Sequence, residues 1–347
     1  MIRFILVAML IAGPVAAQTQ PAPLVIAHRG ASGERPEHTR AAYELAIDQG
    51  ADVIEPDLVM SKDGHLVVRH ENEISETTDV ATRPEFADRR TTRTIDGRPV
   101  TGWFTEDFTL AELRTLRARE RLPALRPASA GFDGQEPILT FQEVIDIARA
   151  GSARTGRTVG VAPELKHSTY FASIGLPMEP PLIAALSANA LMAADSPVMI
   201  QSFEVEVLRS LGQATDAPLL QLMSPVGGPF DRPGMTYAEM ARPEGLAEIA
   251  TYADAIGVET SLIYPRDASG AAPVATRLVA DAHAAGLKVV VWTFRAEDVF
   301  LPVEFRGGED HGLGDMAGWL GRFYRLGVDA VFTDHPGIAV QARSDRP

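Results

Sequence analysis

Several short apolar runs in this sequence end in side chains that can move a proton or hold a charge. The run Leu24–Ala27 is followed directly by His28 and Arg29. A buried strand usually ends in turn residues, so this pair indicates a function. An imidazole can act as acid or base near neutral pH, and a guanidinium can grip two oxygens of a phosphate.

A second group consists of charged side chains spaced two residues apart. Glu55 and Asp57 lie in DVIEPDL, and Glu164 and Lys166 lie in VAPELK. Residues two apart on a strand share a face, so three carboxylates from two strands would form an oxygen-rich site for Ca²⁺ or Mg²⁺. Few nitrogen ligands lie beside them, which argues against zinc. The alternative is a salt-bridged core in which Lys166 or Arg29 neutralises the acids.

A second histidine, His70, follows the strand-like stretch GHLVVR and is the other acid–base candidate. Pro56 lies between the two acids of DVIEPDL, and because proline is rare in central strands it predicts a bulge or a special backbone there. The remaining histidines are expected to be structural: His38, His65, His167, His283, His311 and His335. Of these, His38 could also cap a turn or fix a loop.

These residues need elements that bring them to one place. The alternation of strands and helices predicts an α/β fold, namely a (β/α)₈ TIM barrel, with a doubly wound open sheet as the alternative. In such barrels the active face lies at the carboxyl ends of the strands, where these polar residues gather. Eight β-branched runs are the expected strands: 24–28, 52–58, 158–166, 198–203, 219–223, 255–260, 288–294 and 330–334. Amphipathic segments that end near glycine are the expected helices: 37–50, 140–152, 204–213, 274–287 and 315–327.

One segment departs from this alternation. Residues 71–135 are rich in charged residues, threonine and arginine, and contain one helical stretch, 109–116. A long insertion after the second strand region of a barrel is expected to cover the active face. We therefore expect residues 24–342 to form a single domain that includes this insertion.

Composition and the N-terminus limit the function further. The chain of 347 residues has no cysteine, which excludes disulfides, thiolate metal sites and cysteine nucleophiles. Its net charge of −14 argues against a general binder of nucleic acid or anionic membranes. Residues 1–17 combine Arg3, a short apolar core and small residues before Gln18. This order predicts a cleaved secretory signal peptide, and hence a periplasmic or secreted protein without stable membrane insertion.

Other hydrolase classes lack their motifs here. The sequence has no G-x-S-x-G elbow of a serine esterase and no Walker phosphate loop. The first strand carries AHRG rather than the His-x-His pair of an amidohydrolase barrel. Arg29 beside a carboxylate cluster instead points to a phosphate ester.

The motifs AHRGASGERPEHT, GADVIEPDLVMSKDGHLVVRH, APELK, QSF, VWTFR and VFTDHP, in this order, resemble the glycerophosphodiester phosphodiesterase family. They span nearly the whole expected mature chain, and the insertion is similar to that of the larger, periplasmic bacterial branch. The resemblance implies a Ca²⁺-dependent TIM barrel, with Mg²⁺ as the second choice. It would hydrolyse small-molecule glycerophosphodiesters to sn-glycerol 3-phosphate and an alcohol, and a homodimer is left open.

The resemblance also implies roles at the matching positions. His28 and His70 would form the general acid–base pair, and Arg29 would hold the phosphate with the help of Lys166. The implied metal ligands are Glu55, Asp57 and Glu164, and the implied walls of the glycerol pocket are Phe203 and Trp292.

Two positions depart from the family's common pattern. His70-Glu71 replaces His-Asp, and Phe294-Arg295 replaces Val-Asn. The first puts the contact beside His70 in question more than the catalysis. Two other functions stay open: a related barrel phospholipase D that acts on intact lipid, and a non-catalytic secreted protein that binds phosphodiesters. The first would need an apolar docking rim, and the retained His28 and His70 argue against the second.

Overall fold

Eight parallel strands close into a barrel in the computed structural model, which describes residues 22–308 and 312–345. Each strand pairs in parallel with the next around the ring, and the last strand pairs with the first. The predicted (β/α)₈ barrel is therefore confirmed. The segments are β1 Leu24–His28, β2 Val53–Glu55, β3 Asp57–Met60, β7 Gly160–Val161, β8 Glu164–Leu165, β9 Ile200–Ser202, β10 Leu219–Met223, β11 Ala255–Glu259, β12 Lys288–Phe294 and β13 Ala330–Thr333.

Two of these strands are interrupted by proline. The second strand consists of β2 and β3, separated by Pro56, and the third consists of β7 and β8, separated by Ala162 and Pro163. Hydrogen bonds carry the ladder across both breaks, since the Ala162 N–H donates to the Ile54 carbonyl at 3.0 Å and the Glu164 N–H to the Pro56 carbonyl at 2.9 Å. The special backbone predicted at Pro56 is confirmed, because proline has no N–H to donate to the ladder.

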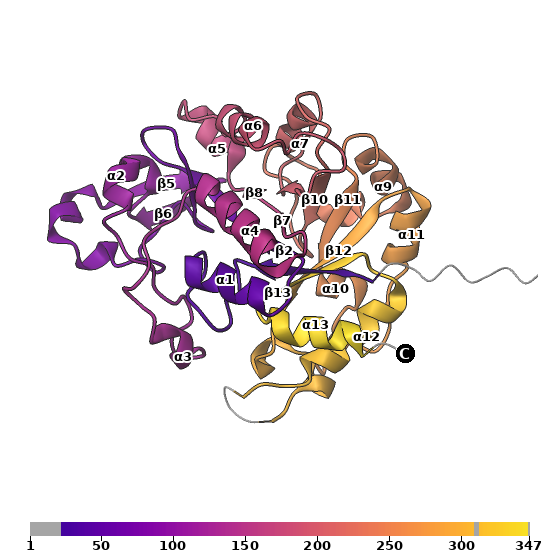
Figure 1. Cartoon of the computed structure of the whole chain (residues 1–347). Coiled ribbons are helices and arrows are strands. Elements are labelled where there is room, and N and C mark those ends of the chain that lie inside the picture. Colours follow the sequence, from indigo (N-terminus) through magenta and orange to yellow (C-terminus); the bar gives the residue numbers. More distant parts are fainter. Residues whose placement is uncertain (1–21, 309–311, 346–347) are drawn as a thin grey trace, which may run out of the picture.

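Helices surround the barrel (Figure 1). Each predicted helical segment outside the insertion contains one: α1 Arg40–Asp48, α4 Phe141–Thr155, α7 Val205–Leu211, α11 Leu278–Ala284 and α12 Met316–Leu326. The longest, α4, begins at a capping box formed by Thr140 and Glu143 and ends at the left-handed Gly156. The remaining helices were not predicted: α5 Ser168–Ser173, α6 Glu179–Ala188, α8 Tyr237–Met240, α9 Pro243–Ile249, α10 Thr260–Ile263, α13 Pro336–Ser344, and the 3₁₀ turns η4 Asp298–Phe300 and η5 Val303–Phe305.

Apolar side chains fill the inside of the barrel, as expected for this fold. Two of them, Leu222 and Phe332, also line the large cavity at the end of the barrel. Interior packing thus supplies part of the cavity wall. The buried apolar side chains inside the barrel are Ile26, Ala162, Leu220, Leu222, Ala255, Val290, Ala330 and Phe332.

Residues 71–135 contain a hairpin that the sequence analysis did not predict. Its strands join at Asp96 and Gly97, which both have positive φ (47° and 76°). An Asp-Gly pair is typical of such two-residue turns. Elements of this segment lie to one side of the barrel in Figure 1. They are η1 Val80–Thr82, η2 Pro84–Arg89, β5 Thr91–Ile95, β6 Arg98–Gly102, η3 Thr105–Asp107, α2 Leu110–Leu113 and α3 Pro127–Ala130, and β4 Leu66–Val68 precedes them antiparallel to β3.

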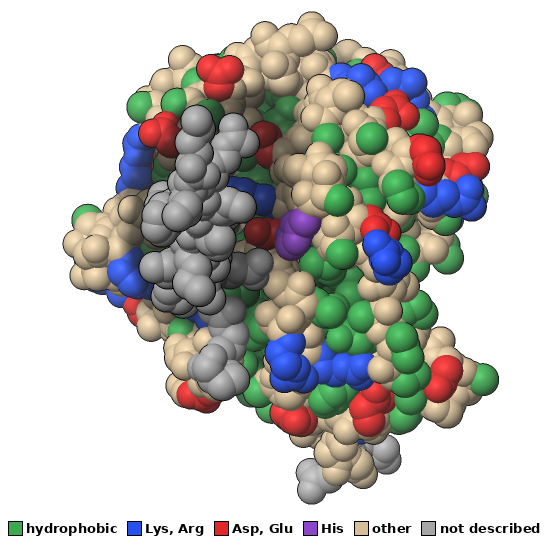
Figure 2. Space-filling model, turned by 90° about the vertical axis from the view of Figure 1, so that its right-hand side faces the viewer, with side chains coloured by type: hydrophobic (Ala, Val, Ile, Leu, Met, Phe, Trp, Pro, Cys, Tyr) green, Lys and Arg blue, Asp and Glu red, His purple; other side chains and the backbone are tan. Residues whose placement is uncertain are grey.

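The predicted signal peptide, residues 1–17, lies outside the described residues. In the part of the chain that the structure describes, no helix has the length and apolar character needed to cross a bilayer. Figure 2 shows one face of the molecule, on which acidic and basic side chains lie beside each other in several places among hydrophobic ones. On this face the charges are mixed rather than gathered by sign.

The chain turns sharply after β1. Arg29 and Gly30 both adopt left-handed conformations, with φ of 59° and 86°. Neighbours on a continuing strand would point to opposite faces, and the turn instead lets His28 and Arg29 line the same cavity. A Cβ atom at Gly30 would lie 2.7 Å from the Ala42 carbonyl carbon in α1. Glycine is therefore required here by both conformation and space.

We predict that Gly30→Ala lowers the free energy of unfolding by about 2–5 kcal/mol, because it combines left-handed strain with a backbone clash. Gly64→Ala is the matched control, since Gly64 is also left-handed (φ 81°) but has nothing within 4 Å of its Cβ position. It should cost only about 1–2 kcal/mol. Urea denaturation of both variants measures the difference, and equal losses would show that the Ala42 contact is unimportant.

Candidate active site

A cavity of about 950 Å³ lies at the carboxyl ends of the barrel strands. Residues of the insertion, among them Glu71, Asp96 and Arg98, also line it. Eight of the nine predicted site residues line the cavity: His28, Arg29, Glu55, His70, Glu164, Lys166, Phe203 and Trp292. The ninth, Asp57, is 1% exposed and lies behind the cavity wall.

The three predicted metal ligands converge. Glu55, Asp57 and Glu164 each offer a carboxylate oxygen, and these atoms lie within 4.8 Å of one another. Burial, and then repulsion by Asp57 and Glu164, raises the pKa of Glu55 well above its usual range. Burial also raises the pKa of Glu164 to about 8. The crowding of these acids is what a bound cation would relieve.

The donor set fits a hard divalent cation. Glu55, Asp57 and Glu164 present oxygens alone, as Ca²⁺ and Mg²⁺ prefer. Lys166 places its ammonium 3.1 Å from Asp57 Oδ1 and 2.5 Å from Glu164 Oε1. The same carboxylates therefore bind a lysine, as the salt-bridge alternative expected, and form a cluster suited to a metal.

Asp57 is held in its ionised form. Burial alone would raise its pKa, but the charges of Lys166 and Arg29 and the hydrogen bond from His38 hold it well below the usual range. His38 lies 2.9 Å from Asp57 through Nε2 and 2.8 Å from the Tyr43 hydroxyl through Nδ1. Because an ionised carboxylate only accepts, His38 donates from Nε2 and accepts at Nδ1. The sequence analysis expected His38 to be structural, or at most to fix a loop. In the structure it also orients Asp57, a predicted metal ligand.

Arg29 is fixed by carboxylates on three sides. Its backbone N–H donates to Glu55 Oε2 at 2.8 Å, and its Nη1 donates to Glu37 Oε2 at 2.9 Å. Its Nε lies 3.1 Å from Asp57 Oδ2. These contacts hold a buried guanidinium at the edge of the carboxylate cluster, where it can bind an anion. Glu37, which lies in the motif RPEHT, was not predicted as a site residue.

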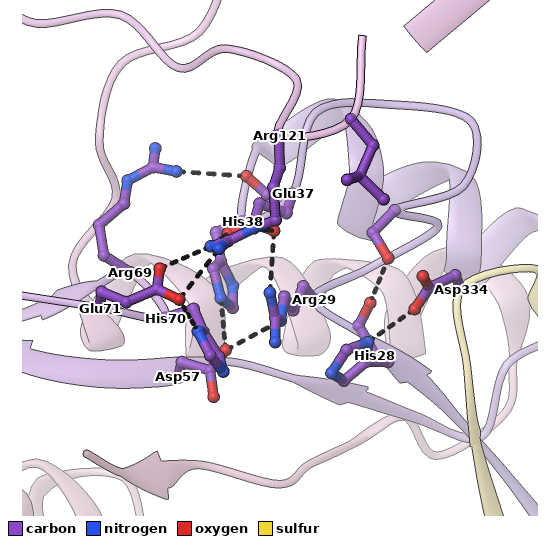
Figure 3. A network of polar contacts seen from close by, with 12 residues as sticks. His28, Arg29, Glu37, His38, Asp57, Arg69, His70, Glu71, Arg121 and Asp334 are labelled. Atoms are coloured by element: carbon purple, nitrogen blue, oxygen red, sulfur yellow. Dashed lines mark hydrogen bonds and ion pairs between the residues drawn. The ribbon is translucent and has the colours of Figure 1, made fainter. Parts of the chain in front are cut away.

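The two predicted acid–base residues have matching environments. His28 places Nδ1 2.6 Å from Asp334 Oδ1, and His70 binds Glu71 Oε1 through Nδ1. Figure 3 shows the two imidazoles on either side of Arg29. Burial and the charge of Arg29 lower the pKa of His28 to about 4. Burial, then Arg29 and Lys166, lowers the pKa of His70 to about 3.

Both carboxylates beside the histidines are ionised. Despite burial, Arg295 and Arg126 hold the pKa of Asp334 well below its usual range. His70 and Arg121 do the same for Glu71. An ionised carboxylate cannot donate, so each imidazole carries its proton on Nδ1. In the neutral rings Nε2 is then the atom free to accept a proton.

The sequence analysis questioned whether the acidic residue after His70 still contacts this histidine, and the structure shows that it does. Glu71, where the family commonly has aspartate, itself binds the His70 imidazole.

Two aromatic side chains form another part of the cavity wall. The rings of Phe203 and Trp292 meet edge to face with centroids 5.7 Å apart. The Lys166 ammonium lies 5.8 Å above the Phe203 ring. The indole N–H of Trp292 is buried and has no hydrogen-bond partner among the described residues. The two rings offer an apolar surface to a small polyol.

Comparison with known proteins gives a consistent result. Residues 28–338 match the model of the glycerophosphoryl diester phosphodiesterase family. A glycerophosphodiester phosphodiesterase of Arabidopsis thaliana is 37% identical over 91% of this chain and 84% of its own length. One from Haemophilus influenzae is 28% identical over 92% of this chain and 89% of its own length.

Solved structures agree in fold. An Oleispira antarctica phosphodiesterase, determined with its product sn-glycerol-3-phosphate, superposes with a TM-score of 0.61. It is 22% identical, over 93% of this chain and 98% of the other. A glycerophosphodiester phosphodiesterase of Agrobacterium tumefaciens superposes with a TM-score of 0.57 at 18% identity, over 92% of this chain and 99% of the other. Since the family model covers nearly the whole barrel, this chain belongs to the glycerophosphoryl diester phosphodiesterase family.

Proposed function

We propose that this protein hydrolyses glycerophosphodiesters, such as glycerophosphocholine or glycerophosphoethanolamine, to sn-glycerol 3-phosphate and an alcohol, and that it needs a divalent cation. One observation carries the proposal: two histidines flank a buried arginine at one cavity, and three clustered carboxylates lie beside that arginine. The family match and the product bound to the Oleispira antarctica neighbour support the choice of substrate class.

Arg29 and Lys166 would bind the phosphate. Both line the cavity, and both are already held by carboxylates, so little side-chain ordering remains on binding. A divalent cation on Glu55, Asp57 and Glu164 would neutralise charge on the phosphoryl oxygens. We propose Ca²⁺ for this position, with Mg²⁺ second, because the ligand set is all oxygen.

His28 and His70 would move the protons. One neutral imidazole would accept a proton from the nucleophile at Nε2. The other, after taking up a proton from solvent at its own Nε2, would donate that proton to the departing oxygen. Whichever imidazole is charged is stabilised by the carboxylate on its Nδ1, Asp334 or Glu71. The arrangement accommodates direct attack by water as well as attack by a glycerol hydroxyl through a cyclic ester.

Phe203 and Trp292 would contact the glycerol. Their rings meet edge to face in the cavity wall and offer apolar surface to its carbon atoms.

We further propose that the protein acts outside the cytoplasm, as in the larger periplasmic branch. The motive is the signal-like order of residues 1–17. Mass spectrometry of protein purified from the periplasm or medium should find a mature chain that begins near Gln18. Protein found only in the cytoplasm with Met1 intact would contradict export.

Removal of divalent cations should lower kcat/KM at least about 100-fold, since metal stabilisation of phosphoryl charge is worth several kcal/mol. Ca²⁺ should restore activity better than Mg²⁺. Glu55→Gln should weaken Ca²⁺ binding, measured by calorimetry, and activity together. Glu259→Gln removes a carboxylate from the same cavity wall but outside the cluster, and it should change neither. Full activity of chelated, metal-free protein would refute the cation requirement.

His28→Ala should lower kcat about 10²- to 10⁴-fold, the usual range for a general acid or base. His70→Ala should be as damaging, and the double variant little worse than either, because the two residues act as one unit. His65→Ala, at a half-exposed site in the β3–β4 turn, is the control and should match the wild type. Steady-state kinetics on glycerophosphocholine decide this, and wild-type rates in a folded His28→Ala protein would make His28 structural.

A further inference from the structure

The two histidines of the site are supported in the same way. Each binds a carboxylate through Nδ1, and each of these carboxylates is bound in turn by an arginine. Both arginines, Arg121 and Arg126, come from one short loop of the insertion. They stand five positions apart in the sequence, whereas the carboxylates that they hold are Glu71 and Asp334. One loop thus contacts the carboxylate partners of both histidines.

Arg121 binds two carboxylates with the full fork of its guanidinium. Its Nη1 and Nη2 donate to the two oxygens of Glu71 at 2.9 and 2.7 Å. Its Nε and Nη2 donate to the two oxygens of Glu37 at 2.9 and 2.7 Å. Glu37 also holds Arg29, so Arg121 ties the partner of His70 to the partner of the phosphate-binding arginine (Figure 3). Two-pronged contacts of this kind fix orientation as well as charge.

Arg126 makes the corresponding contacts at the other histidine. Its Nη2 donates to Asp334 Oδ2 at 2.6 Å, and its Nε donates to Glu297 Oε1 at 2.5 Å. Its Nη1 donates to the Ser32 carbonyl at 2.8 Å. The side chain is 6% exposed, so these contacts are shielded from water. Arg295 also reaches Asp334, at 2.8 Å, and gives this carboxylate a second cationic partner.

The loop that carries both arginines is itself well anchored. The Arg119 N–H donates to the Thr77 carbonyl at 2.9 Å, and the Glu120 N–H donates to Asp133 Oδ1 at 2.6 Å. The buried Glu120 carboxylate accepts from the Leu122 N–H and the Ser129 hydroxyl at 2.8 and 2.5 Å. A loop fixed by its own hydrogen bonds can present two side chains at defined positions.

We propose that two arginines of this loop position the acid–base pair: Arg121 orients His70 through Glu71, and Arg126 orients His28 through Asp334. The arginines touch neither imidazole and act as positioning residues. They keep each carboxylate aligned to accept from Nδ1–H, which leaves Nε2 free to exchange a proton. The catalytic part of this inference rests on the proposed function.

The kinetic test uses Arg121→Gln, with Arg119→Gln as the matched control. Arg119 lies in the same loop, but its side chain is 46% exposed and, within the described part of the chain, forms an ion pair only with Asp133. Arg121→Gln should lower kcat on glycerophosphocholine about 10- to 100-fold, as expected for loss of a supporting contact. KM should change by less than about threefold. Arg119→Gln should match the wild type.

A double-variant cycle separates positioning from general destabilisation. In the His70→Ala background, Arg121→Gln should lower kcat by less than about threefold more, because the histidine that it orients is gone. A loss as large as in the wild-type background would overturn the proposal for Arg121. At the other histidine, Arg126→Lys keeps the charge without the fork. It should lower kcat less than Arg121→Gln does, because Arg295 still holds Asp334, and equal loss in the His28→Ala background would overturn that half.

A spectroscopic readout tests the geometry without any turnover. Correlation spectra of ¹⁵N-labelled histidine rings should show His70 with a protonated Nδ1 and a bare Nε2 in the wild type and in Arg119→Gln. Arg121→Gln should shift this ring toward a mixture of tautomers. If wild-type protein cleaves no glycerophosphodiester, the proposed function fails, while the ring spectra still decide the positioning. A wild-type His70 ring in Arg121→Gln would overturn it.

Discussion

The burial of three acidic side chains close together at one end of the barrel is the constraint on which the site depends. Glu55, Asp57 and Glu164 are almost fully buried and within 4.8 Å of one another. Buried ions cost several kcal/mol each unless they are paired. The cations beside them, Arg29 and Lys166, are therefore part of the fold as much as of the chemistry. After burial, Arg29 and Lys166 are the groups that lower the pKa of His70, and Arg29 also lowers the pKa of His28, so the cations that pair with the carboxylate cluster also favour the neutral imidazoles.

Several arginines and a lysine line the cavity, although the protein as a whole is acidic, with a net charge of −14. Arg29, Lys166 and Arg295, which line the cavity, each pair with a carboxylate. A phosphodiester anion that enters would meet preformed cationic groups rather than flexible ones, which favours binding at low cost in side-chain order. Local electrostatics, and not net charge, thus decides what this cavity can accept.

Much of this arrangement could be read from the sequence, for definite physical reasons. The strands were found because parallel barrel strands are continuous β-branched runs, and the carboxylate cluster because residues two apart share a strand face. Helix α6 was missed because apolar residues surround it without a single stripe. The β5–β6 hairpin carried a usable signal, the Asp96-Gly97 pair, that was overlooked.

The supporting arginines left no such signal. Arg121 meets Glu37 across 84 positions, and Arg126 meets Asp334 across 208. Contacts of that range follow from how the insertion folds against the barrel, which local patterns do not encode. Asp334 was within reach, since it is the last residue of the predicted strand 330–334, as His28 is the last residue of the predicted strand 24–28.

The most direct test of the central claim identifies both products of one turnover. Wild-type protein with Ca²⁺ should convert glycerophosphocholine into equal amounts of sn-glycerol 3-phosphate and free choline, as quantified by mass spectrometry. Release of phosphocholine and glycerol would place the cleavage on the other side of the phosphorus and contradict the account. Binding of the substrate without any product would contradict it as well.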